Sequence, residues 1–207
     1  MNAPSVQIPA VRREREKQER RAAIMAAAEQ VIIDRGFAAA SIDGIARAAG
    51  LAAGTVYLYF PNREALFQEL LCSKVRLLNA SVAAEMTGGR AFPETLKAVI
   101  LAMLRHFEEH RGFFEIFVRE RLEISRGASR TEGVFAEMEA GTGVMARWLR
   151  ESQKAGVIRG GDPGMMAVAL RGLVFQFTRD WLRSGTKGRL TKFAPFITEF
   201  FMKGAGA

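Results

Sequence analysis

The sequence predicts an all-α protein in which a three-helix N-terminal domain is joined by a long helix to a larger C-terminal helical bundle. Apolar residues recur at helical spacing along most of the 207 residues, whereas no convincing run alternates apolar and polar residues between hairpin turns. Six prolines and scattered glycines divide the chain into segments of helix length. Because 49% of the residues are hydrophobic, these helices can bury a sizeable core.

The composition excludes several classes of protein. The single cysteine, Cys72, cannot form an intrachain disulfide and suits a reducing compartment. No apolar run approaches the ~18 residues of a membrane span, and the N-terminus has no apolar core of signal-peptide type. We therefore expect a cytoplasmic protein with no membrane partner. The net charge of +8 favours polyanionic partners, but it is spread along the chain and does not by itself establish nucleic-acid binding.

The N-terminal residues 1–17 are expected to be disordered or to form a basic arm. Residues 12–21, RREREKQERR, are charged throughout and grade into the first helix, which a stripe of alanine, valine and isoleucine places at 22–35. Gly36 follows as a stop signal. A basic arm could lie in or beside a minor groove, but the three glutamates of this segment favour a solvated face.

Capping signals place the next three helices. Ser41 can accept a hydrogen bond from an amide of the first turn, and Asp43 suits the positive end of the helix dipole. Pro61 ends a short helix, and Asn62 can cap the long helix that follows. The expected helices cover 41–48, 52–59 and 63–86.

The rest of the chain divides in the same way. Asp162 and Pro163 are a strong start signal, because the aspartate caps and the proline tolerates the first helical position. Gly141 and Gly143 weaken the middle of one helix, so a kink or break is expected there. The expected helices cover 93–110, 112–126, 131–156, 163–184 and 191–203.

Residues 41–60, SIDGIARAAGLAAGTVYLYF, have the features of a helix-turn-helix. Two short helices can cross closely because the facing residue, Ala46, is small, and Gly50 tolerates the positive φ of the turn. The second helix would then keep one side exposed for a DNA major groove. The wedge between the helices would be filled by Ile42, Ile45, Leu51 and Val56.

This stretch resembles the DNA-binding domain of the TetR family of bacterial transcriptional regulators. The resemblance covers roughly residues 18–70 and does not continue as a motif beyond them. It implies a helix-turn-helix DNA-binding domain over 18–66 and a ligand-binding and dimerisation domain over 67–207. The matching residues are Gly36-Phe37, Ser41, Ile45-Ala46, Ala49-Gly50-Leu51, Gly54-Thr55-Val56-Tyr57, Tyr59-Phe60 and Asn62-Arg63-Glu64-Ala65-Leu66.

The resemblance implies a set of DNA contacts. Tyr57 and Tyr59 would reach phosphate oxygens, while Phe60 would turn inward. Arg63, where the family usually has lysine, would hold a phosphate, and Ser41 would offer its hydroxyl or helix-end amides to another. Because the residues facing the bases have few donors, phosphate contacts and DNA shape would carry much of the specificity. Those residues are Ala52, Ala53, Gly54 and Thr55.

The resemblance also implies a ligand pocket inside the C-terminal bundle and a homodimer formed by the last two long helices. An aromatic and methionine lining would suit a bulky apolar ligand, with Arg121 available for an anionic end. Each such residue, taken alone, is more often plain core. The pocket candidates are Met103, Phe114, Phe117, Arg121, Met138 and Phe175. The candidates for the dimer interface are Leu173, Phe177, Trp181, Phe196 and Phe200.

One further motif resembles a metal site. His106 to His110, HFEEH, matches the H-x-x-E-H pattern of inverted zinc proteases. Two histidines at i and i+4 can share a metal, so a metal-responsive regulator or a zinc-dependent hydrolase is an alternative. No acidic motif of suitable spacing supplies a third ligand, and histidines also suit the negative end of a helix. We expect no enzyme activity, no metal and no cofactor.

Together these features predict a homodimeric, ligand-responsive regulator of transcription. The favoured form is a repressor that a small apolar or amphipathic ligand releases from a palindromic operator in double-stranded DNA. The ligand would shift the helix over 63–86 and so change the separation of the two DNA-reading heads. An architectural DNA-binding protein without a ligand is the second alternative, and it predicts little sequence preference with steep salt dependence.

Overall fold

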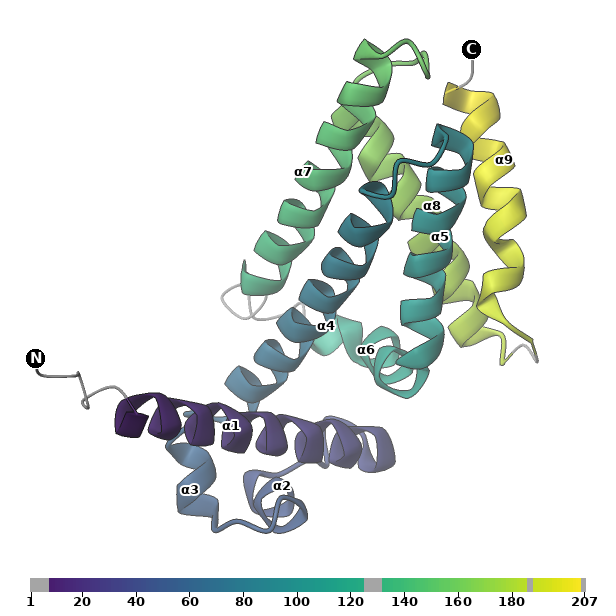
Figure 1. Cartoon of the computed structure of the whole chain (residues 1–207). Helices are drawn as coiled ribbons and strands as arrows, with labels where there is room; N and C mark the ends of the chain where they lie inside the picture. Colours follow the sequence, from purple (N-terminus) through teal and green to yellow (C-terminus); the bar gives the residue numbers. More distant parts are fainter. Residues whose placement is uncertain (1–7, 125–131, 186–187, 206–207) are drawn as a thin grey trace, which may run out of the picture. The chain divides into compact units, whose positions relative to one another are not determined.

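The structure is a computed structural model that describes residues 8–124, 132–185 and 188–205 (Figure 1). Within these residues every regular element is a helix, which confirms the predicted all-α class. The chain divides into two compact units, Met1–Leu70 and Leu71–Ala207, and the division falls inside the fourth helix. None of the described helices is long and apolar enough to cross a membrane.

The first unit contains the helix-turn-helix. Helix α2 packs against both α1 and α3, and Gly50 turns the chain between α2 and α3 with a φ of 68°. A residue with a Cβ rarely adopts that conformation. The helices of this unit are α1 (Ile8–Arg35), α2 (Ile42–Ala48), α3 (Ala53–Tyr57) and the start of α4 (Arg63–Met86). Its core is filled by Ile24, Ala28, Ile45, Val56 and Phe60, all at most 2% exposed.

Side-chain caps begin α2 and α4, as the sequence predicts. Ser41 Oγ accepts a hydrogen bond from the Gly44 amide at 3.1 Å. Asn62 Oδ1 accepts one from the Ala65 amide at 2.7 Å. Ala52, which precedes α3, has no side-chain acceptor and caps nothing. The start of α3 therefore lacks the roughly 1 kcal/mol that a polar cap supplies.

Helix α1 begins at Ile8, so the predicted disorder is wrong for residues 8–17. Ion pairs between side chains four residues apart support this part of the helix: Arg12 Nε lies 2.8 Å from Glu16 Oε1, and Arg15 Nε lies 2.8 Å from Glu19 Oε1. A segment that is polar on all sides has no apolar stripe. The hydrophobic pattern therefore could not locate this helix start.

The second unit is a helical bundle. Helix α8 packs against α5, α6 and α7, while α5 also packs against α9 and a short 3-10 helix, η2. Its elements after α4 are α5 (Phe92–Glu109), α6 (Arg111–Ile124), α7 (Glu132–Lys154), α8 (Pro163–Arg183), η2 (Leu190–Phe193) and α9 (Ala194–Ala205). Side chains with no exposed surface fill its core, among them Leu96, Ile100, Leu104, Met145 and Leu149.

Helix α7 runs without interruption from Glu132 to Lys154, so the predicted break at Gly141 and Gly143 is wrong. Gly141 instead leaves room beside α7 for a side chain of α4 and a side chain of α8. A Cβ at Gly141 would overlap the amide oxygen of Asn79 and lie 2.9 Å from Arg171 Nη1. At Gly143 the nearest atom to such a Cβ, Arg147 Nη1, is 3.8 Å away. A side chain at position 141 would therefore clash with its neighbours, whereas a small side chain at position 143 would fit.

Alanine substitutions at these glycines are expected to have opposite effects on stability. Gly143→Ala should raise the free energy of unfolding by about 0.5–1 kcal/mol, because alanine favours a helix over glycine. Gly141→Ala should lower it, because a displaced Asn79 loses its 2.8 Å hydrogen bond to the Glu137 carbonyl. Urea unfolding measures both changes. Equal stabilisation by the two substitutions would contradict the close approach.

Candidate functional site

The start of α3 carries the residues predicted to face DNA bases. Ala52 and Gly54 are exposed, and Ala53 and Thr55 are half-buried. Val56 has no exposed surface and anchors the helix to the core of the first unit. Small side chains therefore line the start of this helix, and Thr55 is the one among the four that has a hydrogen-bonding side chain.

The last residue of α3, Tyr57, and the turn that follows it carry both buried and exposed aromatic side chains. Phe60 is 2% exposed, whereas Tyr57 is 53% exposed and Tyr59 is half-buried. Leu58, which the sequence reading did not single out, is 83% exposed. The sequence could have indicated this exposure, because Val56 and Phe60 on either side of Leu58 already face the core. Leu58 thus adds an apolar side chain to the exposed surface, suited to contact with thymine methyl groups.

Arg63 holds the loop between α1 and α2. Its Nη1 donates to three backbone carbonyls of that loop, those of Phe37, Ala38 and Ala40, at 3.2, 3.0 and 3.3 Å. Its Nη2 donates to Glu64 Oε1 at 3.3 Å, and the guanidinium carbon lies 4.6 Å from the centre of the Phe37 ring. These contacts use much of the guanidinium group that was predicted to bind a phosphate. Every residue has a backbone carbonyl, so the sequence could not show that these three would accept hydrogen bonds from Arg63.

Ser41 lies at the end of the same loop. Its side chain is exposed, and its oxygen already accepts the hydrogen bond from Gly44 that caps α2. A hydroxyl that accepts one hydrogen bond can still donate its own hydrogen. Ser41 therefore keeps the capacity to donate to a phosphate oxygen, and Arg63 fixes the loop that leads to it through the Ala40 carbonyl.

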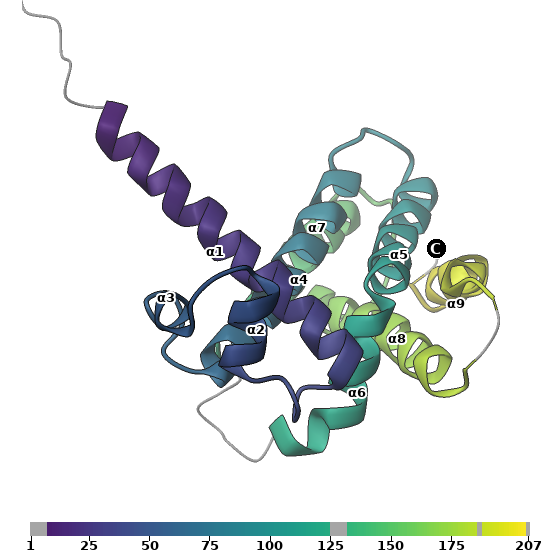
Figure 2. The same ribbon diagram turned by 90° about the horizontal axis from the view of Figure 1, so that it is seen from below.

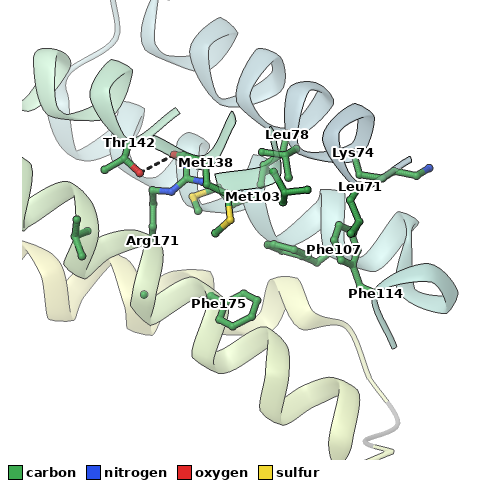
Figure 3. Close-up of a pocket in the computed structure, with 14 residues that line it drawn as sticks. Leu71, Lys74, Leu78, Met103, Phe107, Phe114, Met138, Thr142, Arg171 and Phe175 are labelled. Atoms are coloured by element: carbon green, nitrogen blue, oxygen red, sulfur yellow. Dashed lines mark hydrogen bonds between the residues drawn. The ribbon is translucent and has the colours of Figure 1, made fainter. Parts of the chain in front are cut away.

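A cavity of about 290 Å³ opens among α4, α5, α6, α7 and α8 in the second unit (Figure 3). Four of the six predicted pocket residues line it: Met103, Phe114, Met138 and Phe175. The other two, Phe117 and Arg121, have side chains outside the described part of the structure. Further apolar lining comes from Leu71, Val75, Leu78, Phe107, Val134 and Val168.

Arg171 supplies a cation to this apolar cavity. Its side chain extends from α8 towards Met138 and Thr142 (Figure 3). Burial lowers the pKa of its guanidinium below its usual range, and no residue in the described ranges forms a hydrogen bond or an ion pair with it. The sequence reading assigned the cation of the pocket to Arg121. The missed signal was that Arg171 interrupts the apolar sequence of α8.

Lys74 belongs to the same lining and lies away from Arg171 (Figure 3). It is next to the pair formed by His106 and His110. It is 6% exposed, and its Nζ lies 3.2 Å from His110 Nδ1. The rings of His106 and His110 are 4.8 Å apart. In the described ranges no third histidine, cysteine or carboxylate joins them in a metal-binding group. Because an ammonium repels a metal cation, this arrangement gives no support to the zinc or metal-sensor alternatives.

His106 is expected to make stability depend on pH. Burial, followed by the charges of His110 and Lys74, lowers the pKa of His106 from 6.5 to about 4. The unfolded chain therefore binds this proton first as the pH falls. The free energy of unfolding should decrease between pH 6.5 and about 4, with a slope of up to about 1.4 kcal/mol per pH unit from this group.

A His106→Gln variant supplies the comparison, because glutamine does not titrate. Urea unfolding of both proteins from neutral pH down to about 5 should show the smaller slope in the variant. Above the unfolded-state pKa both states carry a neutral His106, so no difference in slope is expected there. Equal slopes throughout the acidic range would contradict the lowered pKa of His106.

The exposed side of α8 and α9 carries an aromatic stripe. Phe196 and Phe200 are each 56% exposed, and their ring centres are 6.1 Å apart. Phe177 is half-buried, as is Leu173, and the Phe177 ring centre lies 5.7 Å from that of Phe196. These four residues remain candidates for a dimer interface.

Trp181, the fifth interface candidate, is buried within its own chain, which corrects the prediction. It is 6% exposed, and its Nε1 donates a hydrogen bond to the Gly188 carbonyl at 2.9 Å. The guanidinium carbon of Arg111 lies 4.9 Å from its ring centre. An apolar stripe in a sequence does not tell which of its members face the interior of the protomer and which face a partner.

Known proteins resemble this chain in sequence and in fold. The family described as bacterial regulatory proteins, tetR family, matches residues 24–70. The chain is 31% identical over 112 residues to TtgW of Pseudomonas putida, an uncharacterized HTH-type transcriptional regulator. This match covers 53% of this chain and 81% of TtgW.

Two solved structures share the fold. Fatty acid degradation regulator FadR from Bacillus halodurans superposes with a TM-score of 0.80 at 22% identity, over 89% of this chain and 95% of that one. FadR from Bacillus subtilis in complex with stearoyl-CoA superposes with a TM-score of 0.78 at 22% identity, over 88% of this chain and 97% of that one. The helix-turn-helix, the helical second unit and the sequence match agree: this chain belongs to the TetR family of bacterial transcriptional regulators.

Proposed function

We propose that this regulator is a homodimeric repressor that binds a palindromic operator and is released by an amphipathic ligand. The ligand would have an apolar chain and one anionic end. The observation that carries this proposal is the apolar cavity of about 290 Å³ with the guanidinium of Arg171 in its lining. A lining of this kind favours a ligand whose body is apolar and whose polar end can accept charged hydrogen bonds.

The size of the cavity favours a slender ligand. A volume of about 290 Å³ lies at the small end of the roughly 300–1,000 Å³ of ligand pockets. An unbranched acyl chain can thread between aromatic and methionine side chains that a bulky ring system would have to displace. The fold shared with a FadR that is in complex with stearoyl-CoA supports an acyl compound as the class to try first.

The proposed dimer uses the aromatic stripe of α8 and α9, defined by Leu173, Phe177, Phe196 and Phe200. Two phenylalanines that are each 56% exposed leave apolar surface in water, and a second copy of the chain would cover it. A two-fold dimer places two α3 helices in successive major grooves. The operator should therefore be palindromic, with half-sites separated by one helical turn or a multiple of it.

Helix α4 is the proposed link between ligand and DNA. It begins with Arg63, which holds the loop before α2, and it later contributes Leu71, Lys74 and Leu78 to the cavity. A ligand that moves α4 would change how the DNA-reading heads are held. It releases DNA only if it binds the released state more tightly than the DNA-bound state.

Selection of genomic DNA fragments by the purified protein, at near-physiological salt, tests the proposal. A short palindrome common to the recovered fragments is the expected result, and saturated fatty acids or their CoA thioesters should release it in a binding assay. Recovery of fragments without a common sequence would instead support an architectural DNA-binding protein. A recovered palindrome that no acyl compound releases would leave a specific DNA-binding protein but refute the proposed ligand class.

A further inference from the structure

The N-terminal part of α1 is a helix with nothing packed against it. Every residue from Val11 to Arg20 is exposed. The first residue that joins the core is Arg21, whose guanidinium carbon lies 4.7 Å from the ring centre of Phe60 and whose Nη2 lies 3.5 Å from Glu69 Oε2. Within the first unit, this end of α1 projects beyond α2 and α3 (Figure 2).

The charges on this projecting segment are partly neutralised and partly not. Two of its three glutamates pair with a cation four residues away, Glu16 with Arg12 and Glu19 with Arg15. The third, Glu14, accepts a hydrogen bond from the neutral Gln18. Three further cations have no ion pair or hydrogen bond with any described residue. They are Arg13, Lys17 and Arg20, and together they are called the basic stripe below.

The basic stripe lies on one side of the helix. Its residues are spaced i, i+4 and i+7, which places them on a single face. Ile24 continues this spacing and is completely buried. The stripe is therefore the continuation of the side of α1 that covers the helix-turn-helix. Its last member, Arg20, is followed by Arg21, which contacts Phe60, three residues after the exposed Tyr57 of α3.

Helix stability does not explain this arrangement. Like charges four residues apart, such as Arg13 and Lys17, destabilise a helix by a few tenths of a kcal/mol. Departures from locally favourable choices are expected where a residue serves a function.

We propose that Arg13, Lys17 and Arg20 bind the phosphate backbone of DNA beside the groove that receives α3. The proposal rests on the DNA binding proposed above and adds a contact outside the helix-turn-helix. From Arg13 to Arg20 the helix rises about 10 Å, which corresponds to about three steps of one DNA strand at 3.4 Å each. The contact carries no sequence preference, because phosphates are the same at every base pair.

The test compares two variants that lose the same charge from the same segment. Arg13→Gln/Lys17→Gln removes two members of the basic stripe, while Arg12→Gln/Arg15→Gln removes two cations that are already paired with glutamates. The control also leaves two carboxylates unpaired, so its long-range repulsion of DNA is at least as strong. Circular dichroism and thermal unfolding should show that both proteins fold like the wild type.

The measurement is the salt dependence of affinity for a mixed-sequence duplex of about three helical turns, followed by fluorescence anisotropy. Each lost phosphate contact should reduce the slope of log affinity against log salt by about 0.9, so the stripe variant should lose about 2 per bound protomer. The control should keep a slope close to that of the wild type. An unchanged slope in the stripe variant, or an equal loss in both variants, would overturn the proposal. Failure of the wild-type protein to bind DNA would refute the proposed function instead.

Discussion

Replacing Arg63 with alanine is expected to lower the free energy of unfolding by about 2–3 kcal/mol and to weaken binding to DNA of every sequence. The side chain donates to the carbonyls of Phe37, Ala38 and Ala40 at 3.0–3.3 Å. Its removal leaves these acceptors without their charged donor and frees the loop that leads to α2. Urea unfolding and affinity for the selected operator measure the two effects.

An Arg63→Lys variant separates the two roles that this residue can have. Lysine keeps the charge that a phosphate needs, but it lacks the planar fork of the guanidinium. If Arg63 acts mainly as a phosphate contact, the lysine variant should bind DNA nearly as well as the wild type. If it acts mainly by holding the loop, DNA affinity should fall together with stability in both variants. Wild-type stability and affinity in Arg63→Ala would contradict both roles.

Replacing Arg171 with methionine is expected to remove the preference of the cavity for anionic ligands. Charged hydrogen bonds contribute about 1.5–3 kcal/mol, so a fatty acid should bind roughly 10- to 150-fold more weakly. The corresponding fatty alcohol should bind the variant as well as it binds the wild type. Methionine retains an unbranched stem of similar shape, so the cavity should keep its apolar character.

The same substitution should leave the ligand-free protein at least as stable as the wild type. Burial lowers the pKa of Arg171, which indicates that its charge is held at a cost in the folded state. An apolar replacement removes that cost. Calorimetric titration with dodecanoate and with dodecanol, together with urea unfolding of the ligand-free proteins, tests both statements. Equal affinity of both proteins for dodecanoate would remove Arg171 from the ligand site.

The binding of CoA thioesters can be decided with the same two proteins. A thioester has no carboxylate at the end of its acyl chain, so a ligand anchored at Arg171 should be the free acid. Tighter binding of dodecanoyl-CoA than of dodecanoate, unaffected by Arg171→Met, would show that the polar end of the ligand is recognised elsewhere.

The sequence by itself determined the all-α class and the helix-turn-helix, because both depend on neighbours along the chain. Ser41 caps α2 and Asn62 caps α4 through bonds to amides three residues later. Gly50 has the positive φ that its place between two short helices requires. Four of the pocket candidates also line one cavity.

The tertiary structure alone decided which groups from distant segments meet. Arg63 was predicted to grip a phosphate, and only the structure showed that its donors also reach loop carbonyls at least 23 residues away in the chain. Gly141 was predicted to break α7, but it makes room for side chains of α4 and α8. Trp181 was predicted to face a partner, but it is buried against Arg111 and Gly188. Local patterns record how a segment folds, whereas these outcomes depend on what packs against it, and that is settled only when the helices assemble.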